Sequence, residues 1–170
     1  MRFLMTRLKY VDPTRPRSWI TRAGLAIFTS RPALFVSRHV FWRLDPWLLR
    51  VTGGRLSMTL VVRTAVLETR GAKTGELRRN AVIYFHDGDR VTIVPSHAGS
   101  ARNPGWFHNL RASPDVTFGT IAMRANVVAD EVERTRLWVL ADRVFPPYAK
   151  FRRKAAEANR TIPIVQLTPR

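Results

Sequence analysis

The alternation of apolar and polar residues from residue 64 onward predicts a series of short β-strands. We expect these strands at residues 64–69, 77–86, 91–96, 115–118, 121–129 and 161–169. The dipeptide Asp87-Gly88 is typical of a tight hairpin between the second and third strands, and a turn near Gly119 joins the fourth and fifth. Because most of the strands are linked by short turns, the pattern predicts an antiparallel sheet or barrel of about six strands.

Helical patterns accompany these strands. A short helix is expected at 103–114, where Asn103 stands at the capping position. A longer helix is expected at 131–144, where the Asp130 carboxylate is placed to cap the first turn. The apolar spacing around Tyr148 predicts one more helix before the closing strand. The predicted fold class is therefore mainly β with helices (α+β), with helices packed near the C-terminus.

The first part of the chain differs in character from the rest. Residues 1–55 are basic and rich in aromatic side chains, and their clearest local signal is a helix at 45–54 that starts with Pro46 and ends in glycine. Residues 56–170 hold the predicted strands. We therefore expect an N-terminal helical segment followed by one strand-rich domain.

The charge of the chain limits the partners that it suits. Lysine and arginine total 29 against 12 acidic residues, for a net charge of +17. This balance favours polyanions or a phosphorylated small molecule. The sequence argues against nucleic acid, because it has no helix-turn-helix or zinc-finger pattern and its aromatic residues are not interleaved as in an RNA-binding sheet. Cysteine is absent and the four histidines are scattered, so no metal site is expected.

The location that the sequence predicts is the cytoplasm. Arginines interrupt every apolar stretch at short intervals, whereas a membrane-spanning helix needs about 20 mostly apolar residues. Residues 19–50 nevertheless mix tryptophan, phenylalanine and leucine with arginine, a composition typical of segments that lie on anionic lipid. We therefore expect either peripheral contact with the inner face of the plasma membrane or packing of this segment on the barrel.

A basic turn at 70–76 is the first candidate binding element. Gly71 and Gly75 free its backbone, Lys73 lies at its tip, and Arg78 follows it on the next strand. Exposed backbone N–H groups together with cations suit a phosphate. The GxxxxGK[ST] spacing of a P-loop is absent, so the alternative is an ordinary solvated basic hairpin turn.

A second candidate element runs from the end of the third strand into the short helix. Ser96 and His97 end that strand, and Gly99 belongs to a run of small residues that permits close approach by a flat ligand. Trp106 is able to wall a ring system or to serve as a core residue. His97 is likewise either a proton donor or an ordinary loop residue.

These motifs together resemble a known family. The ordered set GAKTGELRRN (71–80), the Asp87-Gly88 hairpin and SHAGSARNPGWFHNLRASPDV (96–116) is similar to the deazaflavin (F420)-dependent nitroreductase and quinone-reductase family. LDPWLLRVTGGR (44–55) and NRTIPIV (159–165) extend the resemblance. It implies a split β-barrel that binds coenzyme F420 in a groove.

The resemblance also implies roles for individual residues. Lys73 and Arg78 would face the phosphate and acidic tail of the coenzyme, and Tyr148 would lie over the acceptor pocket. The implied coenzyme-binding residues are Lys73, Arg78, Asn80, Ser96, His97, Gly99, Trp106 and Asn109. The candidate catalytic donors of hydrogen bonds to the acceptor are Ser96, His97 and Tyr148.

The expected function is transfer of a hydride from reduced F420 to a quinone, a nitro compound or another activated small-molecule acceptor. The cofactor itself carries that chemistry. FMN satisfies the same charges, so an FMN-binding split-barrel oxidoreductase is the closest alternative. A non-catalytic protein that binds a coenzyme or a polyanion is a further one.

Overall fold

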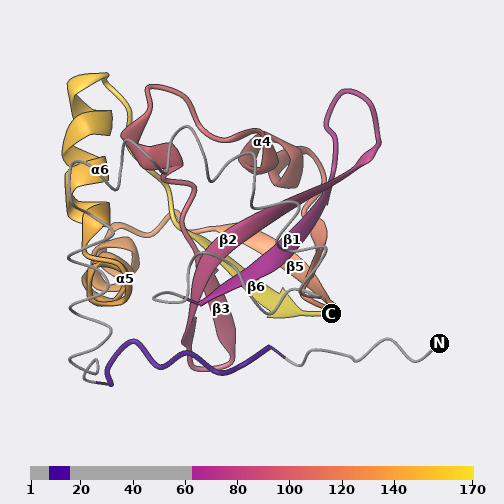
Figure 1. Ribbon diagram of the computed structural model, residues 1–170, viewed down its shortest axis with the longest axis horizontal. Coiled ribbons are helices and arrows are strands. Elements are labelled where there is room, and N and C mark those ends of the chain that lie inside the picture. Colours follow the sequence, from indigo (N-terminus) through magenta and orange to yellow (C-terminus); the bar gives the residue numbers. More distant parts are fainter. Residues whose placement is uncertain (1–7, 16–62) are drawn as a thin grey trace, which may run out of the picture. The chain divides into compact units, whose positions relative to one another are not determined.

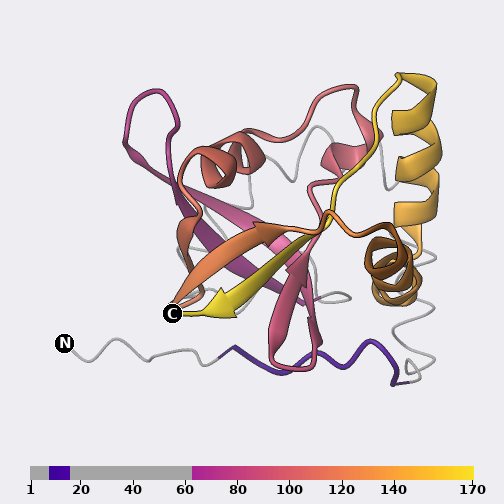
Figure 2. The same ribbon diagram turned by 180° about the vertical axis from the view of Figure 1, so that it is seen from behind.

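The computed structural model describes residues 8–15 and 63–170 (Figures 1 and 2). The elements of this part are β1 Thr64–Arg70, β2 Leu77–Asp87, β3 Arg90–Ile93, the 3₁₀ turn η2 His97–Gly99, α4 Gly105–Ala112, β4 Asp115–Phe118, β5 Ile121–Val127, α5 Glu131–Val144, α6 Pro147–Glu157 and β6 Val165–Pro169. The expected N-terminal helices and the expected domain boundary near residue 55 lie outside the described residues. No helix in the described ranges is long and apolar enough to cross a membrane.

The strands close into a six-stranded barrel in the order β1-β2-β3-β6-β5-β4. Ile93 of β3 lies opposite Tyr84 of β2 on one side and Val165 of β6 on the other, and both pairings are antiparallel. The barrel closes through β1 and β4, where Leu67 lies opposite Phe118. Closure leaves these strands without an open edge. The prediction of about six antiparallel strands with C-terminal helices is therefore confirmed.

The period-two alternation read from the sequence accounts for the barrel interior. On β5, Met123 and Ala125 are buried while Arg124 between them is exposed. The interior is completed by α4, which is seen above β2 in Figure 1. This helix adds Trp106, Phe107 and Leu110 to the same apolar core. One helix thus serves both the core and, as shown below, the functional site.

Helix α5 begins as predicted and is tied to the barrel by an ion pair. The Asp130 carboxylate accepts a hydrogen bond from the Glu133 backbone N–H at 2.7 Å. Arg136 of α5 donates to both carboxylate oxygens of Asp87, at 3.0 and 2.6 Å. The guanidinium of Arg136 holds the pKa of Asp87 below its ordinary value. Asp87 therefore fixes α5 in addition to forming the hairpin.

Helix α6 lies beside α5 in both views (Figures 1 and 2). Arg152 of α6 donates to both carboxylate oxygens of Asp142 on α5, at 2.8 and 2.6 Å. Its guanidinium also lies 4.2 Å from the centre of the Trp138 ring, a cation–π contact. These contacts fix α6 against α5.

Residues 8–14, the N-terminal strap, contact the β2–β3 hairpin (Figure 1). Val11 donates its backbone N–H to Nδ1 of His86 at 3.0 Å, and the His86 backbone N–H donates to the Val11 carbonyl at 2.8 Å. Tyr10 stacks on the His86 ring with centres 4.5 Å apart. Because Nδ1 accepts a hydrogen bond, it carries no proton, and burial also lowers the pKa of His86.

Three local predictions need correction. The third strand ends at Ile93 instead of residue 96, and the closing strand begins at Val165 instead of residue 161. Asn103 does not cap α4, whose N-cap residue is Pro104 and has no side-chain cap. The Asn103 side-chain oxygen instead accepts a hydrogen bond from Nε of Arg160 at 3.0 Å. The partner of Asn103 is therefore a charged side chain distant in the sequence, instead of a backbone N–H in the first turn of α4.

Candidate functional site

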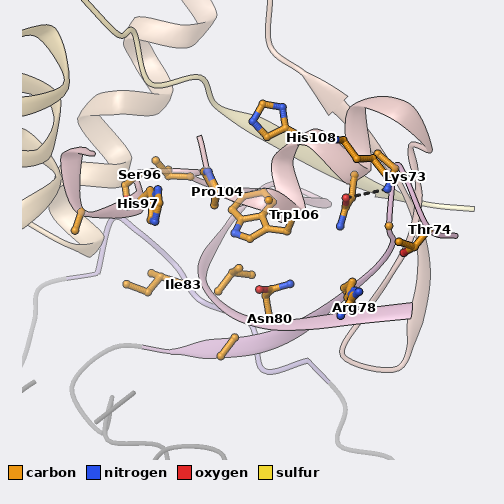
Figure 3. A pocket seen from close by; sticks show the side chains of 18 of the residues that line it. Lys73, Thr74, Arg78, Asn80, Ile83, Ser96, His97, Pro104, Trp106 and His108 are labelled. Carbon is orange, nitrogen blue, oxygen red and sulfur yellow. Dashed lines mark hydrogen bonds between the residues drawn. The ribbon is translucent and has the colours of Figure 1, made fainter. Parts of the chain in front are cut away.

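A groove of about 870 Å³ lies beside the barrel (Figure 3). It is bounded by the β1–β2 turn, by β2, by α4, by α6 and by residues 95–103, which we call the site loop. Figure 3 shows Lys73 and Arg78 toward one end, Ser96 and His97 toward the other, and Trp106 between them. All of the predicted site residues except Gly99 line the groove: Lys73, Arg78, Asn80, Ser96, His97, Trp106, Asn109 and Tyr148.

The β1–β2 turn forms the cationic end of the groove. Gly75 adopts φ +69°, a conformation that glycine tolerates best, and its N–H donates to the Gly71 carbonyl at 2.8 Å. Arg78 is paired with Glu76 at 2.6 Å. In contrast, no acidic side chain of the described ranges pairs with Lys73. Lys73 is therefore the cation here that is most available to an anionic ligand.

Asn109 connects α4 to this turn. Its side-chain oxygen accepts a hydrogen bond from the Ala72 backbone N–H at 3.0 Å, drawn dashed in Figure 3. Its side-chain nitrogen donates to the hydroxyl of buried Thr69 at 3.1 Å. Both functional groups of this amide are thus engaged by the protein. Asn109 lines the groove and also fixes the shape of the turn, a second role that the sequence did not indicate.

The middle of the groove is apolar. Val82 and Ile83 of β2 line it together with Val94 and the largely buried Trp106. Ile83 and Val94 were not predicted as site residues, since a strand residue in an apolar run gives no sign of facing a ligand. An apolar wall with one aromatic side chain suits a flat ring system.

The site loop is conformationally strained where it meets the groove. His97 and Ala98 have positive φ angles of 47° and 50°, which non-glycine residues adopt rarely. The carbonyl of Arg102 lies 3.0 Å from Nδ1 of His97. A carbonyl only accepts hydrogen bonds, so Nδ1 carries a proton, and in the neutral ring Nε2 is the acceptor.

Tyr148 reaches the groove from α6. Its ring is buried and meets the Trp138, Phe145 and Phe151 rings edge-on, with centres 5.1 to 6.4 Å apart. Burial raises the pKa of Tyr148 well above its ordinary value. The phenol therefore keeps its proton in the neutral range and is suited to donate a hydrogen bond.

Gly99 lies in the site loop but packs against α6 instead of lining the groove. A Cβ on Gly99 would lie 2.7 Å from the Phe151 carbonyl oxygen and 3.0 Å from Cβ of Lys154. Glycine at this position allows the loop to lie directly on the helix. The groove thus depends on Gly99 through packing, and Gly99 is not among the residues that line it.

Arg160 is a site component that sequence reasoning missed. It is 8% exposed, and its guanidinium donates to the carbonyls of Pro95, Ser96 and Ser100 in the site loop. Burial lowers its pKa. The residue falls within the 159–165 motif of the resemblance, but nothing in that motif reveals which distant carbonyls it meets.

The groove fits a flat cofactor with an anionic tail. Lys73 and the backbone of the β1–β2 turn suit phosphate or carboxylate groups, and the apolar part of the groove suits a ring. Ser96 and Tyr148, whose side chains carry hydroxyls, also line the groove. A six-stranded barrel with such a groove defines a cofactor-binding domain of the split-barrel class.

Comparison with known proteins identifies the family. The model of the family described as F420H(2)-dependent quinone reductase matches residues 41–169. An F420H(2)-dependent quinone reductase of Mycobacterium tuberculosis H37Rv is 34% identical over 147 residues, which cover 80% of this chain and 97% of that protein. This chain belongs to the F420H(2)-dependent quinone reductase family.

Solved structures agree with this assignment. An F420-H2 dependent reductase has a TM-score of 0.53 and 27% identity, with 61% of this chain and 92% of that chain covered. A structure described as a domain-swapped dimer has a TM-score of 0.54 at 24% identity, covers 74% of this chain and 96% of that chain, and supports the fold alone. The chain is an oxidoreductase whose cofactor is coenzyme F420. FMN, the alternative that the charges had left open, is not supported by these relatives.

Proposed function

We propose that this protein binds reduced F420 in the groove and passes a hydride to a quinone placed beside Tyr148. When bound, the coenzyme supplies the hydride. The observation that supports the proposal is the order of groups along one groove. Lys73, a cation that pairs with no carboxylate of the described ranges, lies at one end, apolar side chains follow, and hydrogen-bond donors lie at the far end. This order matches the anionic tail of the coenzyme, then its ring, then the quinone acceptor.

The anionic tail is assigned to the β1–β2 turn. Lys73 binds it directly, whereas Arg78 is already paired with Glu76 and contributes less until that pair opens. Asn80 lines the groove near Arg78 (Figure 3) and faces the region between tail and ring. Backbone N–H groups of the turn complete the anion site.

The ring is assigned to the centre of the groove and the acceptor to its far end. Val82, Ile83 and Trp106 exclude water from this region, which strengthens any hydrogen bond formed there. As the quinone gains electrons, negative charge develops on its oxygen. Ser96 and Tyr148 stabilise this charge through their O–H groups, and His97 does so when Nε2 is protonated.

Anaerobic titration and turnover test the function. The purified protein is titrated with F420 and with FMN, and reduced F420 is then mixed with menadione while the absorbance of oxidised F420 is followed. We expect F420 binding and catalytic oxidation of the reduced coenzyme. FMN binding without F420 binding would refute the cofactor assignment, and F420 binding without turnover would indicate a coenzyme carrier.

The tail assignment is tested by Lys73→Ala. One charge-assisted hydrogen bond is worth about 1.5–3 kcal/mol, so the dissociation constant for F420 should rise about ten- to a hundred-fold at low salt. Arg78→Ala should have a smaller effect, because Glu76 already neutralises this cation. Arg124→Ala is the matched control, since Arg124 lies on β5 and pairs with Asp115 outside the groove. Unchanged F420 affinity in the Lys73→Ala, Arg78→Ala double variant would refute the assignment.

We also propose that residues 1–50 bring the protein to anionic membrane, where lipid-soluble quinones reside. Most of this segment lies outside the described residues, so composition alone supports the proposal: aromatic residues alternate with Arg17, Arg22, Arg31, Arg38, Arg43 and Arg50. Each cation near an anionic surface contributes about 1 kcal/mol.

Co-sedimentation with phosphatidylglycerol vesicles tests the membrane proposal. The full-length protein is compared with a variant in which these six arginines are replaced by glutamine. We expect the unaltered protein to sediment with the vesicles and the variant to stay in solution. Equal sedimentation of the two proteins would contradict the proposal.

A further inference from the structure

All three nitrogens of the Arg160 guanidinium donate hydrogen bonds to residues of the site loop. Nη2 donates to the Pro95 carbonyl, Nη1 donates to the carbonyls of Ser96 at 3.1 Å and Ser100 at 2.6 Å, and Nε donates to the Asn103 side chain at 3.0 Å. These acceptors stand at the beginning and at the end of the loop. One buried planar cation therefore fixes both ends of the segment that carries His97 and Ala98.

The segment between those ends needs such support. His97 and Ala98 both adopt the left-handed backbone region, which is unfavourable for side chains with a Cβ. Strained conformations of this kind persist only where the surrounding structure holds them. Both residues line the groove, so the strain lies where a ligand would be contacted.

The backbone on both sides of Arg160 is held in place by neighbouring parts of the fold. Helix α6 ends at Glu157, and Asn159 then turns the chain with a φ of 53°. The Arg160 backbone N–H donates to the Ala155 carbonyl at 2.9 Å. Ile162 and Ile164, which follow, are fully or almost fully buried. Arg160 is thus held between the end of α6 and the buried segment that leads into β6.

We propose that Arg160 is a positioning residue, which holds His97 and Ala98 in the geometry that the bound coenzyme and acceptor require. This inference rests on the proposed function, because it assigns a purpose to the loop geometry at that site. Arg160 itself does not line the groove, so it acts through the site loop.

Lysine should be a poor replacement for Arg160. A guanidinium spreads its donors over a plane and so reaches four separate oxygens, whereas an ammonium donates from one nitrogen. Arg160→Lys keeps the charge and much of the packing but leaves some of the loop oxygens without a donor. We therefore expect a folded protein with a loosened site loop. A displacement of about 1 Å costs roughly a hundred-fold in rate.

The experiment compares Arg160→Lys and Arg160→Met with Arg152→Met. Arg152 is a matched control, since it is a partly buried arginine on α6 with a bidentate carboxylate partner, and it does not line the groove. Three quantities are measured: the midpoint of thermal unfolding, amide hydrogen exchange of residues 97–100 without coenzyme, and the F420 dissociation constant together with kcat.

We expect both Arg160 variants to show faster exchange at residues 97–100 and a kcat lowered at least ten-fold. Arg152→Met should keep wild-type exchange in the loop and a kcat within about three-fold, even where its thermal midpoint falls as far. If Arg160→Met does not fold, Arg160→Lys and Asn103→Ala, which removes one acceptor only, provide the comparison.

Two results would overturn the inference. One is loop exchange and kcat at wild-type values in Arg160→Lys. The other is equal losses in the Arg160 and Arg152 variants of matched stability, which would reduce Arg160 to a general contributor to folding. Absence of F420 binding by the unaltered protein would instead refute the proposed function, and this inference with it.

Discussion

Gly99→Ala is expected to destabilise the protein by an amount that the structure allows to be estimated. Gly99 has a φ of +72°, and a Cβ there would lie 2.7 Å from the Phe151 carbonyl oxygen and 3.1 Å from the Phe151 Cα. The left-handed conformation costs a non-glycine residue about 1–2 kcal/mol. Crowding against backbone atoms that have no room to move adds about 1–3 kcal/mol. The free energy of unfolding should therefore fall by about 2–5 kcal/mol.

Gly75→Ala separates these two contributions. Gly75 has a similar φ of +69°, but no atom lies within 4 Å of the position that its Cβ would take. Only the conformational contribution remains, so the expected loss is about 1–2 kcal/mol. The two variants thus share one source of destabilisation and differ in the other.

Urea unfolding at constant pH, followed by tryptophan fluorescence, measures both losses. We expect the transition midpoint of Gly99→Ala to lie clearly below that of Gly75→Ala, with similar slopes. Equal midpoints for the two variants would show that the site loop does not rest on α6 as described. A wild-type midpoint for Gly99→Ala would refute the estimate altogether.

Three further predictions concern His86, Asn109 and Tyr148. Burial lowers the pKa of His86 below 6.5, so as the pH falls below that value the unfolded chain binds a proton that the folded chain does not. The free energy of unfolding should therefore fall as the pH drops from 6.5 toward the pKa of folded His86. In His86→Asn, urea unfolding across this pH range should show a weaker pH dependence. Asn109→Ala leaves the hydroxyl of buried Thr69 and the Ala72 N–H without their partner, so it should lower unfolding free energy by about 1–3 kcal/mol, whereas Asn80→Ala should not. Tyr148→Phe should lower kcat about ten-fold at unchanged F420 affinity in stopped-flow and equilibrium measurements, and an unchanged kcat would exclude its O–H as a donor to the acceptor.

Interactions between residues close in the sequence determine most of the secondary structure in the strand-rich part of the chain. The Asp87-Gly88 hairpin and the Asp130 cap form as predicted, because each depends on residues only a few positions apart. Alternation of apolar residues likewise located the strands and the barrel interior. The basic turn around Lys73 and the run beginning at Ser96 were also identified as candidate binding elements, and the family resemblance gave them their expected roles.

Contacts between distant residues arranged the groove itself. Asn103 was expected to cap α4, yet it accepts a hydrogen bond from Arg160, 57 positions away. Asn109 was expected only to line the site, yet it also joins α4 to Thr69, 40 positions away. Gly99 was expected to line the coenzyme site, and the structure adds that it packs on α6 outside the lining of the groove. Each asparagine has the chemistry to serve either role, and its partner is chosen only when the tertiary fold brings one donor or acceptor within about 3 Å. The place of Gly99, which has no side chain, is decided by the helix that the fold brings against it.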